Sequence, residues 1–226
     1  MKEQGWFIIG VDYNDVGDLA VDMLKNISSP GMFFKITDPY GYQAEIVDAF
    51  TFANCYCTSN SQQFIIVNNT SGYGHYYADC LVSTKGGTYA QIAELACEAQ
   101  TNGVLVSVTS QEKKDFLINT ELPFLGSVQR FHIGLHNLNG SRYWYGYNGT
   151  NSPLGSFQDW VLGFSASSTG DCVFYDQYDG RNWGWETGPC MGANPFPYVC
   201  QFQACDADNY CYLSFFDFTK EKDIHL

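Results

Sequence analysis

Residues Phe131 to Cys200 decide the fold: FHIGLHNLNGSRYWYGYNGTNSPLGSFQDWVLGFSASSTGDCVFYDQYDGRNWGWETGPCMGANPFPYVC. Short apolar runs alternate here with turns rich in Asn and Gly, and tryptophan, glycine and cysteine recur between them. The recurring positions are His132-Ile133-Gly134-Leu135, Trp144, Trp160, Asp171-Cys172, Trp185, Cys190 and Cys200. Short strands separated by such turns are typical of a small, mostly antiparallel sheet.

Two amphipathic helices are predicted on the N-terminal side of this stretch. Residues 88–99 repeat apolar side chains at helical spacing. The predicted apolar stripe consists of Tyr89, Ile92, Ala93, Leu95, Ala96 and Ala99. A second helix begins after Ser110, a residue type that accepts hydrogen bonds at helix N-termini. A strand is predicted at 104–108, and a hairpin of 64–67 with 72–80 precedes the helices. Two helices packed on such a sheet make an α+β domain.

The first 54 residues have a different pattern. Strands are predicted at 6–13 and 32–37, and helices at 15–25 and 43–53, which gives a partial α/β segment of the order βαβα. The segment resembles the closing part of a von Willebrand factor type A domain. The residues that carry this resemblance are Phe7-Ile8-Ile9-Gly10-Val11, Ser29-Pro30-Gly31-Met32-Phe33 and Asn54-Cys55-Tyr56-Cys57. That family builds its metal site largely on an Asp-x-Ser-x-Ser strand. This sequence has no such strand, so metal-dependent adhesion is not expected.

Composition and charge narrow the class of protein. The chain has 226 residues, of which 11 are basic and 24 acidic, so its net charge is -13. Nucleic acid and anionic membranes are therefore unfavourable partners, and no apolar run has the length of a membrane span. Nine cysteines favour an oxidising compartment. Five Asn-x-Ser/Thr sequons, at Asn26, Asn68, Asn69, Asn139 and Asn148, suit a secreted glycoprotein. Because no signal peptide follows Met1, we expect that the true beginning of the chain is missing.

The region from Cys80 to Cys200 resembles a C-type lectin-like domain. The carrying residues are Ala93-Glu94-Leu95-Ala96-Cys97, Leu105-Val106-Ser107-Val108, His132-Ile133-Gly134-Leu135 where the family usually has Trp-Ile-Gly-Leu, and the Trp and Cys positions quoted above. The resemblance implies a protein of the nematode secreted type, in which a von Willebrand A-like segment precedes the lectin-like domain. We predict three parts: a von Willebrand A-like remnant at 1–54, the lectin-like domain at 55–204 and a tail at 205–226.

The resemblance also implies a set of disulfide bonds. That family pairs its first and last domain cysteines and its middle two, which here gives Cys97 with Cys200 and Cys172 with Cys190. Cys57 with Cys80 would brace the N-terminal hairpin, as in long-form members. The spacing of Cys205 and Cys211 suggests a local bridge. Cys55 is left over, either as a free thiol or as the partner of a cysteine upstream.

Calcium-binding members of this family use two triplets of residues that share the ion and the sugar. The first triplet, of acid-Pro-Asn type, falls on Phe164-Ser165-Ala166, and the second, of Trp-Asn-Asp type, falls on Trp185-Glu186-Thr187. Calcium takes six to eight oxygen ligands, several of them anionic. Only Glu186 supplies a carboxylate here. We therefore expect no metal site and no cofactor.

The long-loop region still offers aromatic surface, which can stack on sugar rings or anchor a protein interface. We predict a ligand-binding face that includes Phe164, Tyr178, Trp183 and Glu186. The alternative for Trp183 and for Trp185 is packing in the core, as the family's tryptophan near this cysteine does.

An enzyme is not expected. His132-x-x-x-His136 has the spacing of half a metalloprotease helix, but it lies on a predicted strand and no Glu separates the pair. We expect instead a secreted, extracellular module that recognises a glycan or protein ligand without calcium, with a role in innate defence. A structural or protein-interaction module with no ligand pocket remains an alternative, and calcium-dependent sugar binding is a third.

Overall fold

The N-terminal part of the chain contains a small parallel β-α-β unit. The computed structural model describes residues 8–13, 18–29, 32–35, 46–47, 49–50, 53, 57, 60–67, 74–192 and 195–204. Strand β1 (Gly10–Asp12) pairs in parallel with β2 (Phe33–Lys35), and helix α1 (Asp18–Ile27) connects them. Met32, Phe34 and Ala49 are buried in one cluster beside this pair. The predicted strand-helix-strand order is found here, and backbone at 46–47, 49–50 and 53 is helical.

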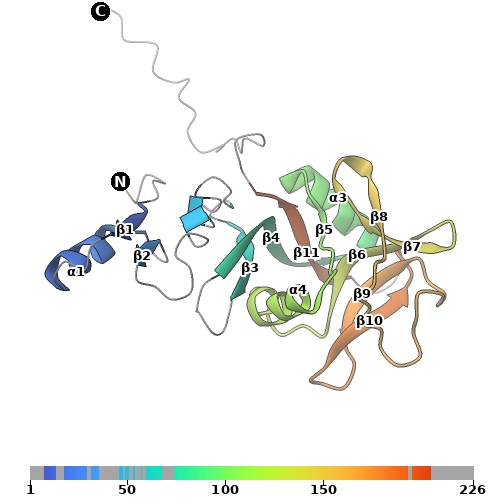
Figure 1. Cartoon of the computed structure of the whole chain (residues 1–226). Coiled ribbons are helices and arrows are strands. Elements are labelled where there is room, and N and C mark those ends of the chain that lie inside the picture. Colours follow the sequence, from blue (N-terminus) through green and yellow to red (C-terminus); the bar gives the residue numbers. More distant parts are fainter. Residues whose placement is uncertain are drawn as a thin grey trace, which may run out of the picture.

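A nine-stranded sheet organises the rest of the described chain (Figure 1). Its main path runs β10 (Trp183–Gly188), β9 (Cys172–Gln177), β6 (Arg130–Leu138), β11 (Phe196–Gln203), β4 (Gly74–Thr88) and β3 (Gln62–Val67). Off this path, β5 (Val104–Leu105) pairs with β11, while β7 (Ser141–Tyr145) pairs with β6 and with β8 (Asn151–Pro153). The pairs are antiparallel except β11 with β6, as predicted for most of the sheet.

Two helical segments pack on this sheet. Helix α3 (Ala90–Thr101) ends at Asn102, which adopts a left-handed conformation. The second segment begins as α4 (Gln111–Phe116), continues as the π-helix η2 (Leu117–Glu121) and ends as α5 (Leu122–Leu125). The Ser110 side chain accepts a hydrogen bond from the backbone N–H of Lys113, so the predicted N-cap is confirmed. Among the described residues, no helix combines the length and the apolar character needed to cross a membrane.

The buried face of α3 differs from the prediction. Ile92 and Leu95 are 42% and 55% exposed, whereas Ala90, Ala93 and Cys97 are buried. Small side chains let the helix backbone approach the sheet closely, and the disulfide of Cys97 fixes that orientation. The predicted stripe is therefore confirmed at Ala93, which is buried, and wrong at Ile92 and Leu95.

The core gathers around Trp185, which has no exposed surface. The rings of Trp144, Trp160 and Phe157 meet the Trp185 ring edge to face, at centroid distances of 5.5, 5.3 and 5.8 Å. Such edge-to-face contacts stabilise a core beyond the burial of their area. The tryptophans that mark the sequence are thus scaffold residues.

His132, which replaces the family's usual tryptophan, is also a core residue. It is only 3% exposed, and its Nε2 atom lies 2.8 Å from the carbonyl oxygen of Thr88 at the end of β4. Burial lowers the pKa of the imidazole, so the neutral ring donates from Nε2 to that carbonyl. The His132 side chain thus links β6 to β4 by a hydrogen bond.

Three disulfides brace the described chain: Cys57–Cys80, Cys97–Cys200 and Cys172–Cys190. They are the three pairings that the resemblance implies for these cysteines. The expected pair Cys205–Cys211 and the leftover Cys55 lie outside the described residues.

A buried ion pair joins the N-terminal hairpin to α4. The Lys113 ammonium, whose residue is 3% exposed, contacts the Asp79 carboxylate and lies 4.6 Å from the centre of the Phe64 ring. Glu121 is 1% exposed and accepts a hydrogen bond of 2.6 Å from the Ser83 hydroxyl. This polar cluster locks β3 and β4 against the second helical segment.

Candidate functional site on the long-loop face

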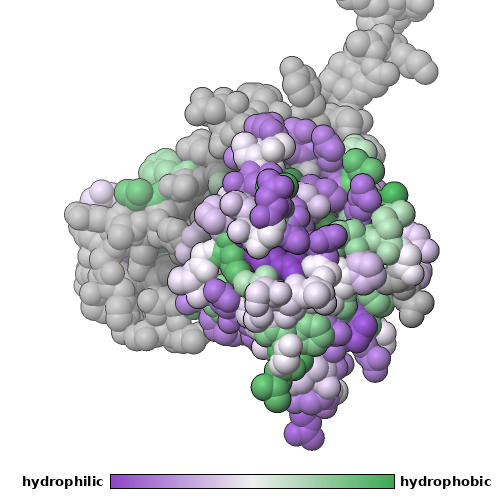
Figure 2. Space-filling view, turned by 90° about the vertical axis from the view of Figure 1, so that its right-hand side faces the viewer, coloured by the Kyte–Doolittle hydropathy of each residue, from purple (hydrophilic) through white to green (hydrophobic). Residues whose placement is uncertain are grey.

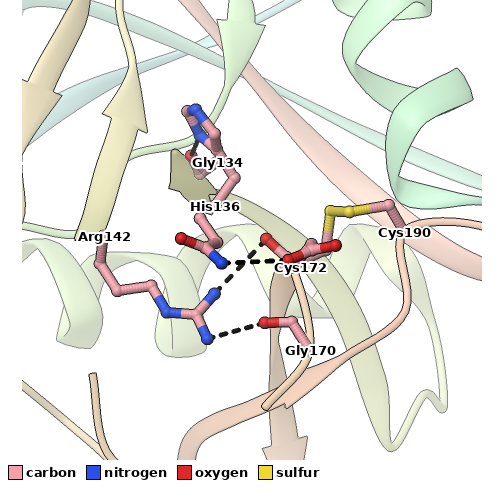
Figure 3. The surroundings of a disulfide bond; sticks show 8 residues. Gly134, His136, Arg142, Gly170, Cys172 and Cys190 are labelled. Atoms are coloured by element: carbon pink, nitrogen blue, oxygen red, sulfur yellow. Dashed lines mark hydrogen bonds between the residues drawn. A yellow bond between two sulfur atoms is a disulfide. The ribbon is translucent and has the colours of Figure 1, made fainter. Parts of the chain in front are cut away.

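One arginine holds the long loop, residues 154–171, against the sheet. Arg142 on β7 is 5% exposed, and its guanidinium donates to the carbonyl oxygens of four loop residues. The acceptors and distances are Ala166 at 3.1 Å, Ser168 at 2.8 Å, Gly170 at 2.7 Å and Asp171 at 3.4 Å. Figure 3 shows the Arg142 side chain pointing toward Gly170, beside the Cys172–Cys190 bridge. A fixed positive charge therefore orders this loop from within.

The two calcium triplets of the resemblance are engaged in internal hydrogen bonds. In the first triplet, the backbone N–H of Ser165 donates to the Ser168 hydroxyl at 2.8 Å, and the Ala166 carbonyl accepts from Arg142. In the second, Thr187 is buried and donates to the carbonyl oxygen of Thr169 at 2.6 Å. Calcium needs a cage of free, largely anionic oxygens. A guanidinium among the loop carbonyls does not fit that requirement.

Glu186, the one carboxylate of the triplets, belongs to a charge cluster across β6, β9 and β10. Arg130 donates from Nη2 to Glu186 at 3.2 Å and from Nε to Asp176 at 2.5 Å. Burial raises the pKa of Glu186, and the Arg130 charge acts in the opposite direction. The cross-strand pair Arg130 with Asp176 places these groups together. The carboxylate that calcium would need is thus paired with a cation.

Two adjoining depressions lie on either side of Arg130, and we call them together the Arg130 groove. Their volumes are about 430 and 380 Å³. The residues that give the groove its chemistry are Arg130, Glu186, Phe174 and Phe196, and Arg130 and Phe196 line both depressions. The guanidinium carbon lies 5.2 Å from the Phe174 ring centre and 5.8 Å from that of Phe196. The groove thus combines hydrogen-bond donors, carboxylate acceptors and an aromatic wall.

The surface on the side of the molecule that carries β7 is mixed in polarity. Figure 2 turns toward the viewer the side of the molecule on which β7 lies in Figure 1, and most of the coloured surface there is hydrophilic or neutral. Hydrophobic side chains gather in separate groups toward the rim of the face. This side of the molecule is therefore suited to polar ligands more than to a broad apolar contact.

The four residues predicted for the ligand-binding face have different positions. Glu186 lines the Arg130 groove. Phe164 is half-buried within the long loop, and Tyr178 is 49% exposed in the turn between β9 and β10. Neither of them lines the groove.

For Trp183, the structure favours the alternative of packing in the core. Trp183 is only 5% exposed, and its ring packs 5.5 Å from that of Phe131. Side chains two apart on a strand share a face, so Trp183 is buried with Trp185. The alternative, packing in the core, describes both residues.

Sequence reasoning missed Arg130, Phe174 and Phe196. They come from three strands, β6, β9 and β11, and only the register between those strands places them together. Each position on its own has the pattern of an ordinary strand residue. The presence of Arg130 one residue before the marked stretch was the available signal, because a charge at the start of a buried strand needs a partner.

Comparisons with known proteins agree with this architecture. Residues 88–202 match the family described as Lectin C-type domain. C-type lectin domain-containing protein 160 of Caenorhabditis elegans is 27% identical in an alignment 224 residues long that covers 93% of this chain and 34% of that protein. Rat (Rattus norvegicus) lithostathine is 29% identical over 138 residues, 61% of this chain and 76% of that protein. The chain thus spans about a third of the length of its nematode relative.

A solved structure has the same fold. The crystal structure of human lithostathine superposes with a TM-score of 0.50 at 24% identity, covering 66% of this chain and 91% of that one. The matched family covers α3, the marked tryptophans and both bridges of the long-loop region, which are the features that build the face described above. The chain is therefore a member of the C-type lectin domain family.

Proposed function

We propose that this protein is a secreted recognition module that binds a glycan in the Arg130 groove without calcium. The observation that carries the proposal is the Arg142 guanidinium, which makes four hydrogen bonds to carbonyl oxygens of the long loop. Because the Arg142 side chain supplies the positive charge that orders the loop, the loop needs no bound metal ion for its conformation. Secretion is supported by three disulfides, which persist in oxidising compartments.

The chemistry of the groove favours a ligand rich in hydroxyl groups. Sugar hydroxyls both donate and accept hydrogen bonds. Of the residues that line the groove, Glu186 can accept and Arg130 can donate. The Phe196 ring, which is half-buried, adds an apolar wall against which a sugar face can pack. The same wall with Pro197 beside it favours a protein ligand as the second candidate.

Other parts of the prediction also stand as proposals. We propose that residues 1–54 are a von Willebrand A-like segment, that 55–204 form the lectin-like domain and that 205–226 are a tail. The family match supports a binding module and not an enzyme. A role in innate defence is proposed with the same module.

A glycan array with the full chain, in calcium and in excess chelator, tests the proposal. We expect binding to the same glycans in both conditions, and a loss of at least about tenfold in Arg130→Gln, since the guanidinium supplies charge-assisted hydrogen bonds. Arg181→Gln is the matched control, because Arg181 is exposed in the turn after β9. Binding that chelator abolishes would contradict the proposal and favour calcium-dependent sugar recognition. The absence of glycan binding in both conditions would favour the module without a ligand pocket.

A further inference from the structure

A second hollow lies away from the Arg130 groove, between α3 and the strands β6 and β7. Its volume is about 360 Å³. The lining residues that determine its chemistry are Glu94, Glu98, His136, Tyr145 and Asn148. His136 and Arg130 are six residues apart on β6, so the two sites are separated by about 20 Å at the rise of a strand. We call this hollow the α3–β7 pocket.

The pocket has two carboxylates in its lining and neither lysine nor arginine. Glu94 is half-buried, and its Oε2 atom accepts a hydrogen bond of 2.8 Å from the backbone N–H of Leu105, which fixes the orientation of the carboxyl group. Burial, together with the neighbouring Glu98 carboxylate, raises the pKa of Glu94 to about 7, against the effect of the Leu105 hydrogen bond. A cation in the pocket would relieve this unfavourable ionisation.

An aromatic wall and a third acceptor complete the pocket. His136 is only 8% exposed. Its ring stacks on the Tyr145 ring, with a distance of 3.9 Å between the ring centroids and an interplanar angle of 13°. Burial lowers the pKa of His136, so its ring is neutral near pH 7. Its Nδ1 atom lies 3.4 Å from the carbonyl oxygen of Gly134, and Figure 3 shows the ring turned away from Arg142. With Nδ1 donating, Nε2 is an acceptor that has no partner among the described residues.

We propose that the α3–β7 pocket binds the guanidinium of an arginine side chain presented by a partner protein. Three acceptor side chains face a cavity without a competing cation, and a guanidinium offers five N–H donors in one plane. A planar guanidinium also packs against aromatic rings, as the Tyr145 wall requires. An ammonium group has the charge but lacks the planar set of donors. The pocket would thus recognise a protein independently of the proposed glycan site.

The probe is N-acetyl-arginine amide, and its neutral isostere N-acetyl-citrulline amide is the matched control. The full chain is titrated both with and without its N-glycans, because Asn148 belongs to a sequon and also lines the pocket. We expect saturable binding of the arginine probe in titrations followed by amide NMR, with the largest shifts at Glu94, Glu98 and Tyr145. The citrulline probe should bind at least about tenfold more weakly, since it cannot form charge-assisted hydrogen bonds with the two carboxylates.

Two variants locate the binding. Glu98→Gln keeps the size of an exposed side chain, so it should fold normally, and we expect it to weaken arginine binding at least fivefold. Glu186→Gln, in the Arg130 groove, should leave arginine binding unchanged, which separates this site from the proposed function. Equal binding of the two probes, an unaffected Glu98→Gln variant, or no saturation at the solubility limit of the arginine probe would each overturn the proposal. Glucosamine carries an ammonium group and no guanidinium. If it binds more tightly than the arginine probe, the proposal is overturned as well.

Discussion

Arg142 donates a hydrogen bond of 2.7 Å to the carbonyl oxygen of Gly170, so a side chain of β7 contacts the last turn of the long loop directly. Gly170 has φ of +106°, and a Cβ atom there would lie 2.8 Å from the backbone nitrogen of Gly188. Only glycine allows the chain to pass between β10 and the guanidinium. The loop conformation therefore depends on both residues together.

Replacement of this arginine should loosen the loop. We expect Arg142→Met to lower the free energy of unfolding by about 2–4 kcal/mol, because four loop carbonyl groups lose a charged donor. Hydrogen exchange of the amides at 165–171 should accelerate more than that of β6. Arg181→Met, an exposed arginine, is the control and should change neither quantity. Unchanged exchange in the loop of Arg142→Met would show that the guanidinium is not what orders it.

Calcium should have no effect on thermal unfolding. Since the guanidinium already contacts the loop carbonyls, we expect the same Tm, within about 1 °C, in millimolar calcium and in chelator. Differential scanning calorimetry of the wild-type chain measures this directly. A calcium-dependent rise in Tm of several degrees would mean that oxygens other than those of the two triplets bind the ion.

The glycine of the His132-Ile133-Gly134-Leu135 motif allows β6 to approach β5. A Cβ atom at Gly134 would lie 2.5 Å from the carbonyl oxygen of Leu105. We expect Gly134→Ala to destabilise the domain by about 2–4 kcal/mol, since backbone and not a flexible side chain must move. Gly86→Ala on β4 is the control, because nothing lies within 4 Å of its added methyl group. Urea unfolding of the two variants compares them, and equal midpoints would contradict the predicted close approach.

Loss of one partner of the buried ion pair between Lys113 and Asp79 should lower the free energy of unfolding more than loss of both partners does. Burial lowers the pKa of Lys113, while Asp79 raises it. We expect Lys113→Met to reduce stability by about 3–5 kcal/mol, because the Asp79 carboxylate is left without its cation. The double variant Lys113→Met with Asp79→Leu should recover part of that loss. Lys85→Met, an exposed lysine on β4, should be neutral. A double variant less stable than Lys113→Met would contradict the account.

The contribution of the Glu94 carboxyl group to the free energy of unfolding should fall as the pH rises. Its pKa is about 7 in the folded chain, against an ordinary value of 4.5, so between these values the folded state holds a proton that the unfolded state has released. The free energy of unfolding contributed by this group falls from pH 4.5 to 7 and is constant above. Glu98, Tyr145 and His136 are the titratable neighbours in the pocket.

Comparison with Glu94→Gln isolates this carboxyl from His136. Burial lowers the pKa of His136, so its contribution to the free energy of unfolding falls as the pH drops below 6.5. We expect the variant to be more stable than wild type by about 1–2 kcal/mol at pH 8, since solvent screens the half-buried group. The difference should disappear near pH 4.5. A variant that is less stable at pH 8 would reverse the predicted sign.

The sequence predicts the scaffold better than it predicts the site. The Trp, Gly and Cys positions are local marks of a fold, and Ser110, Trp185 and the three disulfides lie where those marks place them. The Arg130 groove depends instead on strand register, which turns and tertiary packing determine. Arg142 has the pattern of a solvent-facing residue on an amphipathic strand. Its burial becomes evident only once the loop that covers it is in place.

The positions of the disulfides also determine how the domain would respond to a mechanical pull. Cys80 on β4 lies opposite Phe202 on β11, and Cys57 is bonded to Cys80, so tension applied at residues 57 and 204 enters through this pair of strands. As β4 and β11 separate from this end, the break in their pairing arrives at Cys200. There the disulfide bond to Cys97 carries the tension. Residues 98–199 then bear no tension while that bond is intact. The segment that contains Arg130, Arg142 and Glu186 would keep its shape under forces that stretch the chain on either side.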